Sequence, residues 1–379
     1  MTRVTSMQSL KTDIEVIQQV FDHIDKGTTD LGEATWHEPT VNYTSESRLQ
    51  AEIDLMKRIP VAYAPSAALT EPGSYVAHDV AGVPVVVVRD REMNLRAFRN
   101  ACRHRGMLLA EGEGKASVFR CTYHGWAYST DGKLQHVPHD AGFPDLDFDS
   151  YGLVPIHDVL EKGGLVFVCL EEPVDQGALT DLPTLIPEDH LVFDRAESDN
   201  NFNWKLNIEA TLEGYHIKPT HETTFYPYGY DNLNVVETFG RNGRIVFPFR
   251  RIEELRGVPE SERDITGKVT YVYNVFPICT VAVLTNHTSV TISEPLSPGR
   301  TRIYSWRMGN LAGSESEEEL TKMRRDASFV AETGLVEDME VIARIQAGLN
   351  SGANEHFTYG LYEKAIVQLL SNLTNLIDD

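Results

Sequence analysis

Four potential metal ligands lie within 23 residues and constrain this chain more than any other feature. Cys102 and His104 form a C-x-H arm, and Cys121 and His124 form a C-x-x-H arm after a sixteen-residue spacer. Thiolates are soft ligands and imidazoles are intermediate ones, so two of each fit zinc or an iron–sulfur cluster. The alternative is a pair of unrelated Cys/His arms in a β domain. We expect this segment to fold around a metal centre.

The distribution of the ligands over the two arms separates zinc from an iron–sulfur cluster. Zinc fingers keep their cysteines in one arm and their histidines in the other, so that all four side chains reach one ion. Here each arm supplies one sulfur and one nitrogen. This suits two irons, with Cys102 and Cys121 on one and His104 and His124 on the other. A glycine follows each arm and permits a backbone turn near a cluster. The pattern is a Rieske-type [2Fe–2S] signature.

The composition is typical of a globular protein of two or three domains. Of the 379 residues, 41% are hydrophobic and 24% are charged, and no run approaches the roughly 18 apolar residues of a membrane span. The N-terminal sequence lacks the apolar core of a signal peptide, so we expect a cytoplasmic protein without membrane partners. In a reducing compartment, Cys169 and Cys279 are expected to be buried thiols rather than a disulfide.

The net charge of −22 argues against nucleic acid as a partner. Nucleic-acid binding requires a concentrated positive face, and basic residues gather here only at 241–251 and at Arg324 and Arg325. The acidic surface favours solubility and also permits docking to a partner that carries a basic patch.

The first part of the chain is predicted to be helical. Apolar residues recur at helical spacing over 8–26, and Gly27 ends this pattern. A second helix is expected over 45–58. Residues 1–60 are therefore predicted to form a helical arm that packs on the C-terminal domain.

Residues 61–173 are predicted to form a β domain around the two ligand arms. One hairpin is expected to turn at Arg91–Asn94 and to lead directly into the first arm, and another to turn at Asp131–Gly132. The loop over 136–153 is rich in Pro, Gly and Asp and is too long for a tight turn. Because long loops in compact domains are often functional, we expect it to cover the cluster.

The last part of the chain is predicted to form a separate domain. Residues 174–202 are Pro-rich, acidic and weakly periodic, so they are interpreted as a linker, and 203–379 as a domain. Strand patterns over 234–308 are consistent with one antiparallel sheet. Helical patterns follow after Ser314, over 336–349 and over 361–376.

A second set of candidate ligands follows the predicted linker. Glu209, Glu213 and His216 are spaced four and three residues apart, so they are expected to share one face of a helix. Pro219 is expected to break this helix before His221, so that the two histidines converge on one ion. Two imidazoles and one carboxylate with open positions form the facial triad of non-heme Fe(II) oxygenases. The alternative is a surface helix whose two histidines are merely polar.

The order of these motifs makes the chain resemble the catalytic (α) subunit of a Rieske non-heme iron oxygenase over essentially its whole length. In that family, the histidines that correspond to His216 and His221 bind the mononuclear iron. The acid at Glu213 takes the family's catalytic bridging position, which links this iron to the Rieske cluster of a neighbouring subunit. Most members have aspartate there. Glutamate resembles the subgroup of choline, glycine betaine and carnitine monooxygenases.

The third iron ligand must be a carboxylate far downstream. Glu337 and Asp338 lie in GLVEDMEVIARIQAGL, which resembles the ED-x(n)-Q-x-G-L segment of the same subgroup. We assign Asp338 as the ligand and keep Glu337 as the alternative, with Glu340 as a weaker candidate. An acidic patch on a solvated helix is the alternative interpretation of this segment.

The resemblance also implies a fold, cofactors and partners. The fold is α+β, with an all-β Rieske [2Fe–2S] domain and a catalytic domain whose antiparallel sheet is flanked by helices in a helix-grip, or START-like, arrangement. The cofactors are a [2Fe–2S] cluster and a mononuclear non-heme Fe(II). No G-x-G-x-x-G follows a strand, so a separate NAD(P)H reductase must supply electrons, with or without a ferredoxin. A homotrimer is implied, and a small β subunit is left open.

The substrate is the least constrained part of the interpretation. Phe225, Tyr226, Tyr228 and Tyr230 follow the second histidine, and their rings suit an aromatic substrate or a cage for a quaternary ammonium. Ordinary packing explains them equally well. The main interpretation is hydroxylation or dihydroxylation of an aromatic-ring compound with O2, as in aromatic hydrocarbon catabolism. The alternatives are a monooxygenase or demethylase of a betaine or carnitine, and a Rieske electron carrier without catalysis.

Overall fold

The computed structural model describes residues 10–310, 317–332 and 334–378 of the chain. Contacts divide the chain into two compact units, and each is described here by itself. The smaller unit contains residues 56–176 and 186–188, and the larger unit contains the rest. No helix among the described residues is long and apolar enough to cross a membrane.

The smaller unit is built from short antiparallel strands in three sheets. The strand orders are β10-β11-β2, β5-β4-β3-β6 and β7-β8-β9. The hairpins predicted at Arg91–Asn94 and Asp131–Gly132 are confirmed as β4–β5 and β8–β9. Cys169 is buried and unpaired, as expected. The strands are β2 (Val61–Pro65), β3 (Ser74–Val80), β4 (Val83–Arg89), β5 (Leu95–Arg99), β6 (Gly112–Lys115), β7 (Val118–Arg120), β8 (Ala127–Ser129), β9 (Leu134–His136), β10 (Asp158–Lys162) and β11 (Leu165–Cys169).

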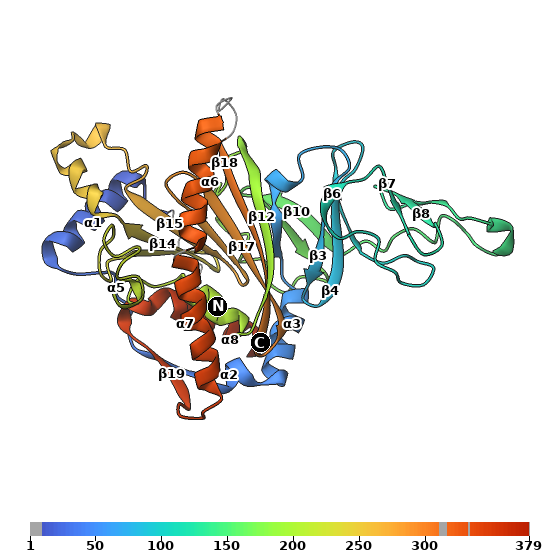
Figure 1. The fold of residues 1–379 in the computed structure, drawn as a ribbon. Coiled ribbons are helices and arrows are strands. Elements are labelled where there is room, and N and C mark those ends of the chain that lie inside the picture. Colours follow the sequence, from blue (N-terminus) through green and yellow to red (C-terminus); the bar gives the residue numbers. More distant parts are fainter. Residues whose placement is uncertain (1–9, 311–316, 333, 379) are drawn as a thin grey trace, which may run out of the picture. The chain divides into compact units, whose positions relative to one another are not determined.

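The larger unit is organised on a seven-stranded antiparallel sheet of order β12-β18-β17-β16-β15-β14-β13 (Figure 1). Consecutive strands are neighbours from β13 to β18, which confirms the single antiparallel sheet expected over 234–308. A separate pair joins β1 to β19. The strands are β1 (Trp36–Pro39), β12 (His190–Asn200), β13 (Val235–Phe239), β14 (Asn242–Pro248), β15 (Val269–Val275), β16 (Cys279–Val283), β17 (Thr288–Ser297), β18 (Arg300–Asn310) and β19 (His356–Tyr359).

Helices pack on this sheet. Helix α1 contacts β13, α4 contacts β17 and α8 contacts β14, while α6 and α7 follow one another in orange and red in Figure 1. The helix expected after Ser314 begins within the described residues at Glu317, because 311–316 lie outside them. The helices are α1 (Asp13–Lys26), α2 (Val41–Thr44), α3 (Glu46–Lys57), α4 (Trp204–Glu209), α5 (Ile217–Thr220), α6 (Glu317–Glu332), α7 (Gly334–Leu349) and α8 (Lys364–Asp378).

The N-terminal helix α1 is shorter than its apolar pattern. The helix was predicted over 8–26; residues 8 and 9 lie outside the described residues, and the helix begins at Asp13. Thr12 and Glu15 form a capping box that fixes this start, and Gly27 ends the helix at φ +60°. The apolar face of α1 packs in one hydrophobic cluster with residues of β13 and β14.

The segment predicted as a linker, 174–202, contains a strand. Its second half is β12, which pairs with β18 at the edge of the seven-stranded sheet. The strand was not predicted because its sequence is rich in charged residues and lacks alternating apolar ones. Its stability comes from cross-strand partners instead. Arg302 Nε forms an ion pair with Asp199 Oδ1 at 2.6 Å, and Arg307 forms an ion pair with Asp194. Charges on an edge strand also discourage pairing with other chains.

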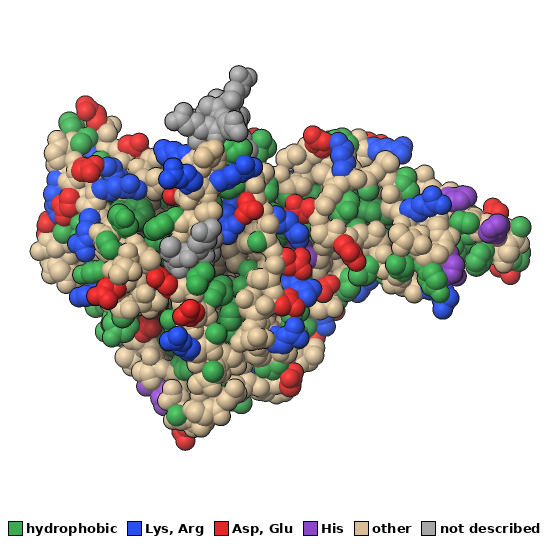
Figure 2. Space-filling model, viewed as in Figure 1, with side chains coloured by type: hydrophobic (Ala, Val, Ile, Leu, Met, Phe, Trp, Pro, Cys, Tyr) green, Lys and Arg blue, Asp and Glu red, His purple; other side chains and the backbone are tan. Residues whose placement is uncertain are grey.

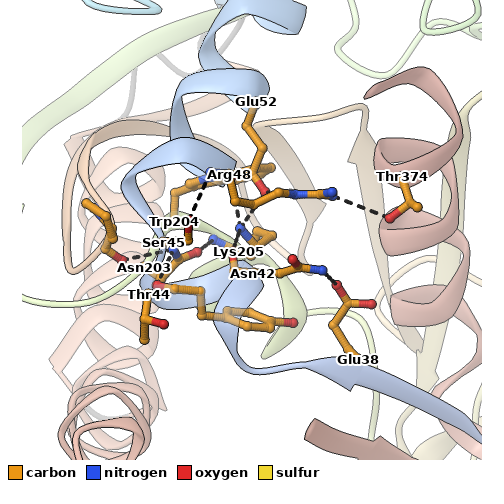
Figure 3. A network of polar contacts seen from close by, with 12 residues as sticks. Glu38, Asn42, Thr44, Ser45, Arg48, Glu52, Asn203, Trp204, Lys205 and Thr374 are labelled. Atoms are coloured by element: carbon orange, nitrogen blue, oxygen red, sulfur yellow. Dashed lines mark hydrogen bonds and ion pairs between the residues drawn. The ribbon is translucent and has the colours of Figure 1, made fainter. Parts of the chain in front are cut away.

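A buried polar network joins the N-terminal segment to α4, the helix that leads to the second candidate site (Figure 3). Glu52 on α3 accepts hydrogen bonds from Lys205 at 2.7 Å, from Trp204 Nε1 at 2.9 Å and from Arg48 at 3.1 Å. These bonds offset the desolvation of a fully buried ion pair. The network fixes the start of α4 against α3.

Candidate metal centres

The two ligand arms of the smaller unit fold into matching loops. The N–H of Gly106 donates to the carbonyl of Cys102 at 2.8 Å, and Gly125 donates to Cys121 at 2.9 Å. In each arm the cysteine N–H also donates to the carbonyl five residues later, at 2.8 Å in both cases. Both glycines have a left-handed φ, +75° and +77°, which a side chain would strain. Sequence spacing thus produces two equivalent turns.

The four side chains fit a cluster with two kinds of ligand. Cys102 and Cys121 lie in the hydrophobic core, 3% exposed each, while the rings of His104 and His124 lie edge-on to one another with centroids 4.7 Å apart. Burial, followed by the neighbouring His124, lowers the pKa of His104, which favours the neutral imidazole that a metal requires. Among the described residues, no three of these ligand atoms lie within 4.8 Å of one another, as one zinc ion would need.

Aromatic side chains and the predicted loop shield this site. Trp126 stacks on His104 at 5.1 Å, and Phe143 from the 136–153 loop lies edge-on to both rings. Pro138 and His139 of the same loop line a cavity beside the ligands, as expected of a loop that covers the cluster. The Tyr128 hydroxyl lies 3.4 Å from Cys102 Sγ, a contact that sequence analysis missed. Histidine and hydrophobic side chains gather at this end of the unit in Figure 2.

The backbone of the second candidate site differs from the sequence prediction. Helix α4 ends at Glu209, so Glu209 and Glu213 do not share a helical face. The chain turns at Gly214, where a Cβ would lie 2.5 Å from the side-chain amide of Asn234. Pro219 does not break a helix either. It lies inside the one-turn helix α5, whose first-turn N–H groups need no helical partner.

The two histidines nevertheless lie close together, with one carboxylate beside both rings. His216 and His221 flank α5 at its two ends, and α7 brings Asp338 between them. Asp338 Oδ1 lies 3.0 Å from His221 Nε2 and 3.6 Å from His216 Nε2. The ligand atoms of all three side chains lie within 4.8 Å of one another, so this group could hold one metal ion.

Two further carboxylates hold the outer nitrogens of the same rings. Glu213 hydrogen bonds with Nδ1 of His216 and also accepts the His216 N–H. Glu337 lies 2.7 Å from Nδ1 of His221 and accepts a hydrogen bond from Thr224 at 2.7 Å. Such partners fix the orientation of a metal-binding imidazole and direct its Nε2 toward the ion. Glu337 is therefore placed behind His221, whereas Asp338 faces the Nε2 atoms.

The electrostatics of the group favour a bound cation. Burial alone would lower the pKa of His216, but its hydrogen bond with Glu213 raises the pKa above the ordinary value. Burial also opposes charge on His221, and hydrogen bonds with Asp338 and Glu337 outweigh it. The three carboxylates thus favour a positive charge on the two imidazoles. A metal ion bound between the Nε2 atoms would supply that positive charge instead of protons.

A cavity of about 720 Å³ opens beside this group. Phe225 packs on the His221 ring at 4.9 Å, and Phe329 of α6 packs on Phe225 at 6.3 Å. One turn before Phe329, Asp326 also lines the cavity, and its hydrogen bond with His287 lowers its pKa, so the carboxylate is ionised. Sequence analysis missed Asp326 and His287, because nothing in their local sequence marks them. The other aromatic residues that line the cavity are Tyr228, Tyr230, Phe247 and Phe249.

A [2Fe–2S]-type site in a β unit and a His₂–carboxylate group beside an apolar cavity define an iron-dependent oxygenase that also carries a cluster for electron transfer. The comparisons identify the family. The chain belongs to the ring hydroxylating alpha subunits, whose catalytic domain matches residues 187–376, and the Rieske [2Fe-2S] domain matches 60–151.

Related sequences include enzymes of two substrate classes. A carnitine monooxygenase oxygenase subunit from Escherichia coli (strain K12) is 28% identical over 303 residues, or 72% of this chain and 79% of that protein. A glycine betaine monooxygenase oxygenase subunit from Pseudomonas aeruginosa (strain UCBPP-PA14) is 35% identical over 39% of this chain and 36% of that protein. A chlorobenzene dioxygenase subunit alpha from Cupriavidus sp. (strain PS12) is 32% identical over 47% and 42%, respectively.

Solved structures share the fold over nearly the whole chain. A quaternary ammonium Rieske monooxygenase in complex with L-carnitine has a TM-score of 0.74 at 19% identity, and covers 97% of this chain and 99% of that one. A naphthalene 1,2-dioxygenase from Rhodococcus sp. has a TM-score of 0.73 at 18% identity, with 96% and 98% covered. The predicted α+β class, with Rieske and catalytic domains, is confirmed.

Membership of this family settles the general activity. The chain is an oxidoreductase, the terminal oxygenase subunit of a Rieske-type system, with a [2Fe–2S] cluster and a mononuclear non-heme iron. The interpretation as an electron carrier without catalysis is therefore wrong, because the catalytic domain is present.

Proposed function

We propose that this chain oxidises a quaternary ammonium compound as a monooxygenase. The carrying observation is the ionised Asp326 in the wall of an aromatic cavity that adjoins the candidate iron ligands. A neutral aromatic ring requires no carboxylate there, whereas a trimethylammonium group is attracted both to ring faces and to a negative charge. The carnitine and glycine betaine relatives agree. This proposal replaces the main interpretation, an aromatic-ring substrate, with the alternative.

We propose the following roles for the side chains of the larger unit. His216, His221 and Asp338 hold the iron, while Glu213 and Glu337 orient the two imidazoles. When bound, the iron supplies the activation of O2. Phe225 and Phe329 present aromatic rings to the ammonium group beside His221. Asp326 balances its charge.

The proposed reaction breaks a carbon–nitrogen bond. A C–H bond on a carbon attached to nitrogen gains one oxygen atom of O2. The other oxygen atom leaves as water, formed with two electrons and two protons. The hydroxyl proton is then lost, the carbon becomes a carbonyl, and the nitrogen keeps the electron pair as a tertiary amine. The acids around the cavity are suited to accept that proton.

We propose that Cys102, His104, Cys121 and His124 hold the cluster and that a separate reductase reduces it. Large apolar side chains surround these ligands on the surface of the smaller unit, among them Met107 and Tyr123, which are 41% and 54% exposed. Such a surface suits contact with another chain. The structure of a quaternary ammonium Rieske monooxygenase is described in terms of inter-subunit electron transfer. A homotrimer, in which Glu213 lies on the electron path between neighbouring subunits, is the proposed assembly.

A substrate panel tests the proposed function. The holoenzyme with a generic reductase is given carnitine, γ-butyrobetaine, glycine betaine and choline on one side and aromatic acids on the other. We expect substrate-dependent oxygen uptake, with release of a tertiary amine, from at least one quaternary ammonium compound. Asp326→Asn should raise KM for that compound about tenfold, as for a lost charged partner. Asp22→Asn, on the exposed face of α1, is the matched control. Uptake driven by aromatic acids alone would refute the proposal.

A further inference from the structure

The cavity beside the iron ligands also has a basic end. Arg250 and Arg251 begin the 3₁₀ helix η3 (Arg250–Gly257), and both line the cavity. Among the described residues, neither guanidinium forms an ion pair, although the chain carries 56 acidic residues against 34 Lys and Arg. Other arginines, such as Arg244 and Arg256, pair with carboxylates. Arg250 and Arg251 are both exposed at the edge of this cavity, so their charges are available to bind an anion.

Ring contacts hold both guanidinium groups in place. Arg250 lies 5.4 Å from the ring centroid of Tyr226 and 5.3 Å from that of Tyr230. Its backbone N–H donates to the carbonyl of Tyr228 at 2.7 Å. Contact with aromatic rings occupies the faces of a guanidinium and leaves its in-plane N–H donors available. The Arg250 donors are thus held in position without being used.

Arg251 is fixed in a similar way. Its guanidinium lies 4.9 Å from the centroid of the Phe249 ring, and its Nη2 donates to Thr285 Oγ1 at 3.0 Å. A guanidinium has five N–H donors, so this single bond leaves most of them free for a ligand. A planar carboxylate matches two of these donors at once.

Contacts place the charges of the cavity in order. Phe225 touches the iron ligand His221, Phe329 touches Phe225, and Asp326 lies one helical turn before Phe329 on α6. The charge of Arg251 acts on Asp326, and Arg251 is bonded to Thr285. Acidic side chains therefore surround the candidate iron ligands, while the two arginines line the same cavity from η3.

We propose that Arg250 and Arg251 form a carboxylate subsite, so that the substrate is a zwitterion with a trimethylammonium group at one end and a carboxylate at the other. This inference rests on the proposed function. The acidic end repels a carboxylate and attracts the ammonium group, while the two arginines do the opposite. Opposed charges thus orient the substrate and bring a carbon attached to nitrogen to the iron. A quaternary ammonium compound without a carboxylate, such as choline, lacks the contact with the two arginines.

Methyl esters test the subsite because they remove the carboxylate charge and keep the spacing between the nitrogen and the carboxyl carbon. KM and kcat are measured for carnitine, γ-butyrobetaine and glycine betaine and for the methyl ester of each. In Arg251→Gln and Arg250→Gln, we expect KM of the free acids to rise about tenfold or more, with kcat nearly unchanged. KM of the esters should stay constant. Arg251→Lys should recover part of the loss. Arg300→Gln, at a turn outside the cavity, is the matched control.

Binding separates failure of the subsite from failure of the proposed function. The anion 5,5-dimethylhexanoate has the shape of γ-butyrobetaine without its positive charge, and calorimetry with the holoenzyme measures its affinity. If the wild type oxidises no quaternary ammonium compound, the proposed function fails. Weaker binding of this anion to Arg251→Gln would then still support a carboxylate subsite. Equal KM shifts for acids and esters, or equal affinity of wild type and variant for the anion, would overturn it.

Discussion

Glu209→Gln tests how the buried end of α4 is stabilised. The Glu209 side chain accepts hydrogen bonds from the hydroxyls of Tyr43 at 2.7 Å and Tyr359 at 2.9 Å, and it is fully buried. Burial raises the pKa of Glu209 to about 7, although both tyrosines favour the ionised form. At neutral pH the carboxyl group is therefore poised between its two forms, close to the segment that carries the candidate iron ligands His216 and His221.

The sign of the effect on stability follows from proton linkage. In the unfolded chain Glu209 titrates near 4.5, and in the folded chain it titrates near 7. Between these values only the folded state holds the proton, so the free energy of unfolding falls as pH rises. A shift of 2.5 pKa units corresponds to about 3 kcal/mol. Glutamine keeps an acceptor for the tyrosines and cannot ionise. We expect Glu209→Gln to equal the wild type near pH 5 and to exceed its stability by up to about 3 kcal/mol at pH 8.

Urea unfolding of the iron-loaded protein at pH 5, 6, 7 and 8 measures this difference, with tryptophan fluorescence, to which the buried Trp204 contributes, as the probe. Glu197→Gln, on the exposed edge strand β12, is the matched control and should show no such trend. A constant difference across this range would refute the reasoning. So would a variant that is less stable at pH 8, because the Glu209 charge would then be needed to balance the buried Lys205.

Three predictions concern the metal sites. Asp338→Ala should lower iron from about three to about two atoms per chain, without change in the visible spectrum of the cluster; an unchanged count would disprove Asp338 as a ligand. Glu337→Gln should retain the iron at saturation but bind it about 10–100-fold more weakly in a titration, as for other partners of a ligating histidine. Glu213→Gln should keep both metals and lose turnover, and a fully active variant would contradict its bridging role.

Local sequence was sufficient for the cluster site. Each arm contains its own turn, because the cysteine, the histidine and the glycine follow one another within five residues. Nothing distant is needed to shape the loops from Cys102 to Gly106 and from Cys121 to Gly125. The hairpins of the smaller unit were also predictable, since their turn residues lie beside the strands that they connect.

Long-range contacts explain what the sequence did not predict. The residues from 203 to 216 have helical spacing, yet α4 ends at Glu209, whose side chain is held by hydrogen bonds from Tyr43 and Tyr359. The close contact of Gly214 with Asn234 then turns the chain. The partners lie far from α4 in the sequence, so periodicity could not reveal them. The basic end of the cavity was missed for the same reason.

The adjacent acids Glu337 and Asp338 contact opposite nitrogens of the same imidazole ring, that of His221. Side chains of neighbouring residues on an α-helix point about 100° apart, so sequence alone favours one ligand and leaves the other without a role. In the structure α7 runs beside His221, and this divergence brings one carboxylate to each nitrogen of the same ring. Asp338 meets Nε2 at 3.0 Å and Glu337 meets Nδ1 at 2.7 Å. The shorter side chain faces the metal position and the longer one reaches behind the ring. Exchange of the two acids would therefore disturb both contacts at once.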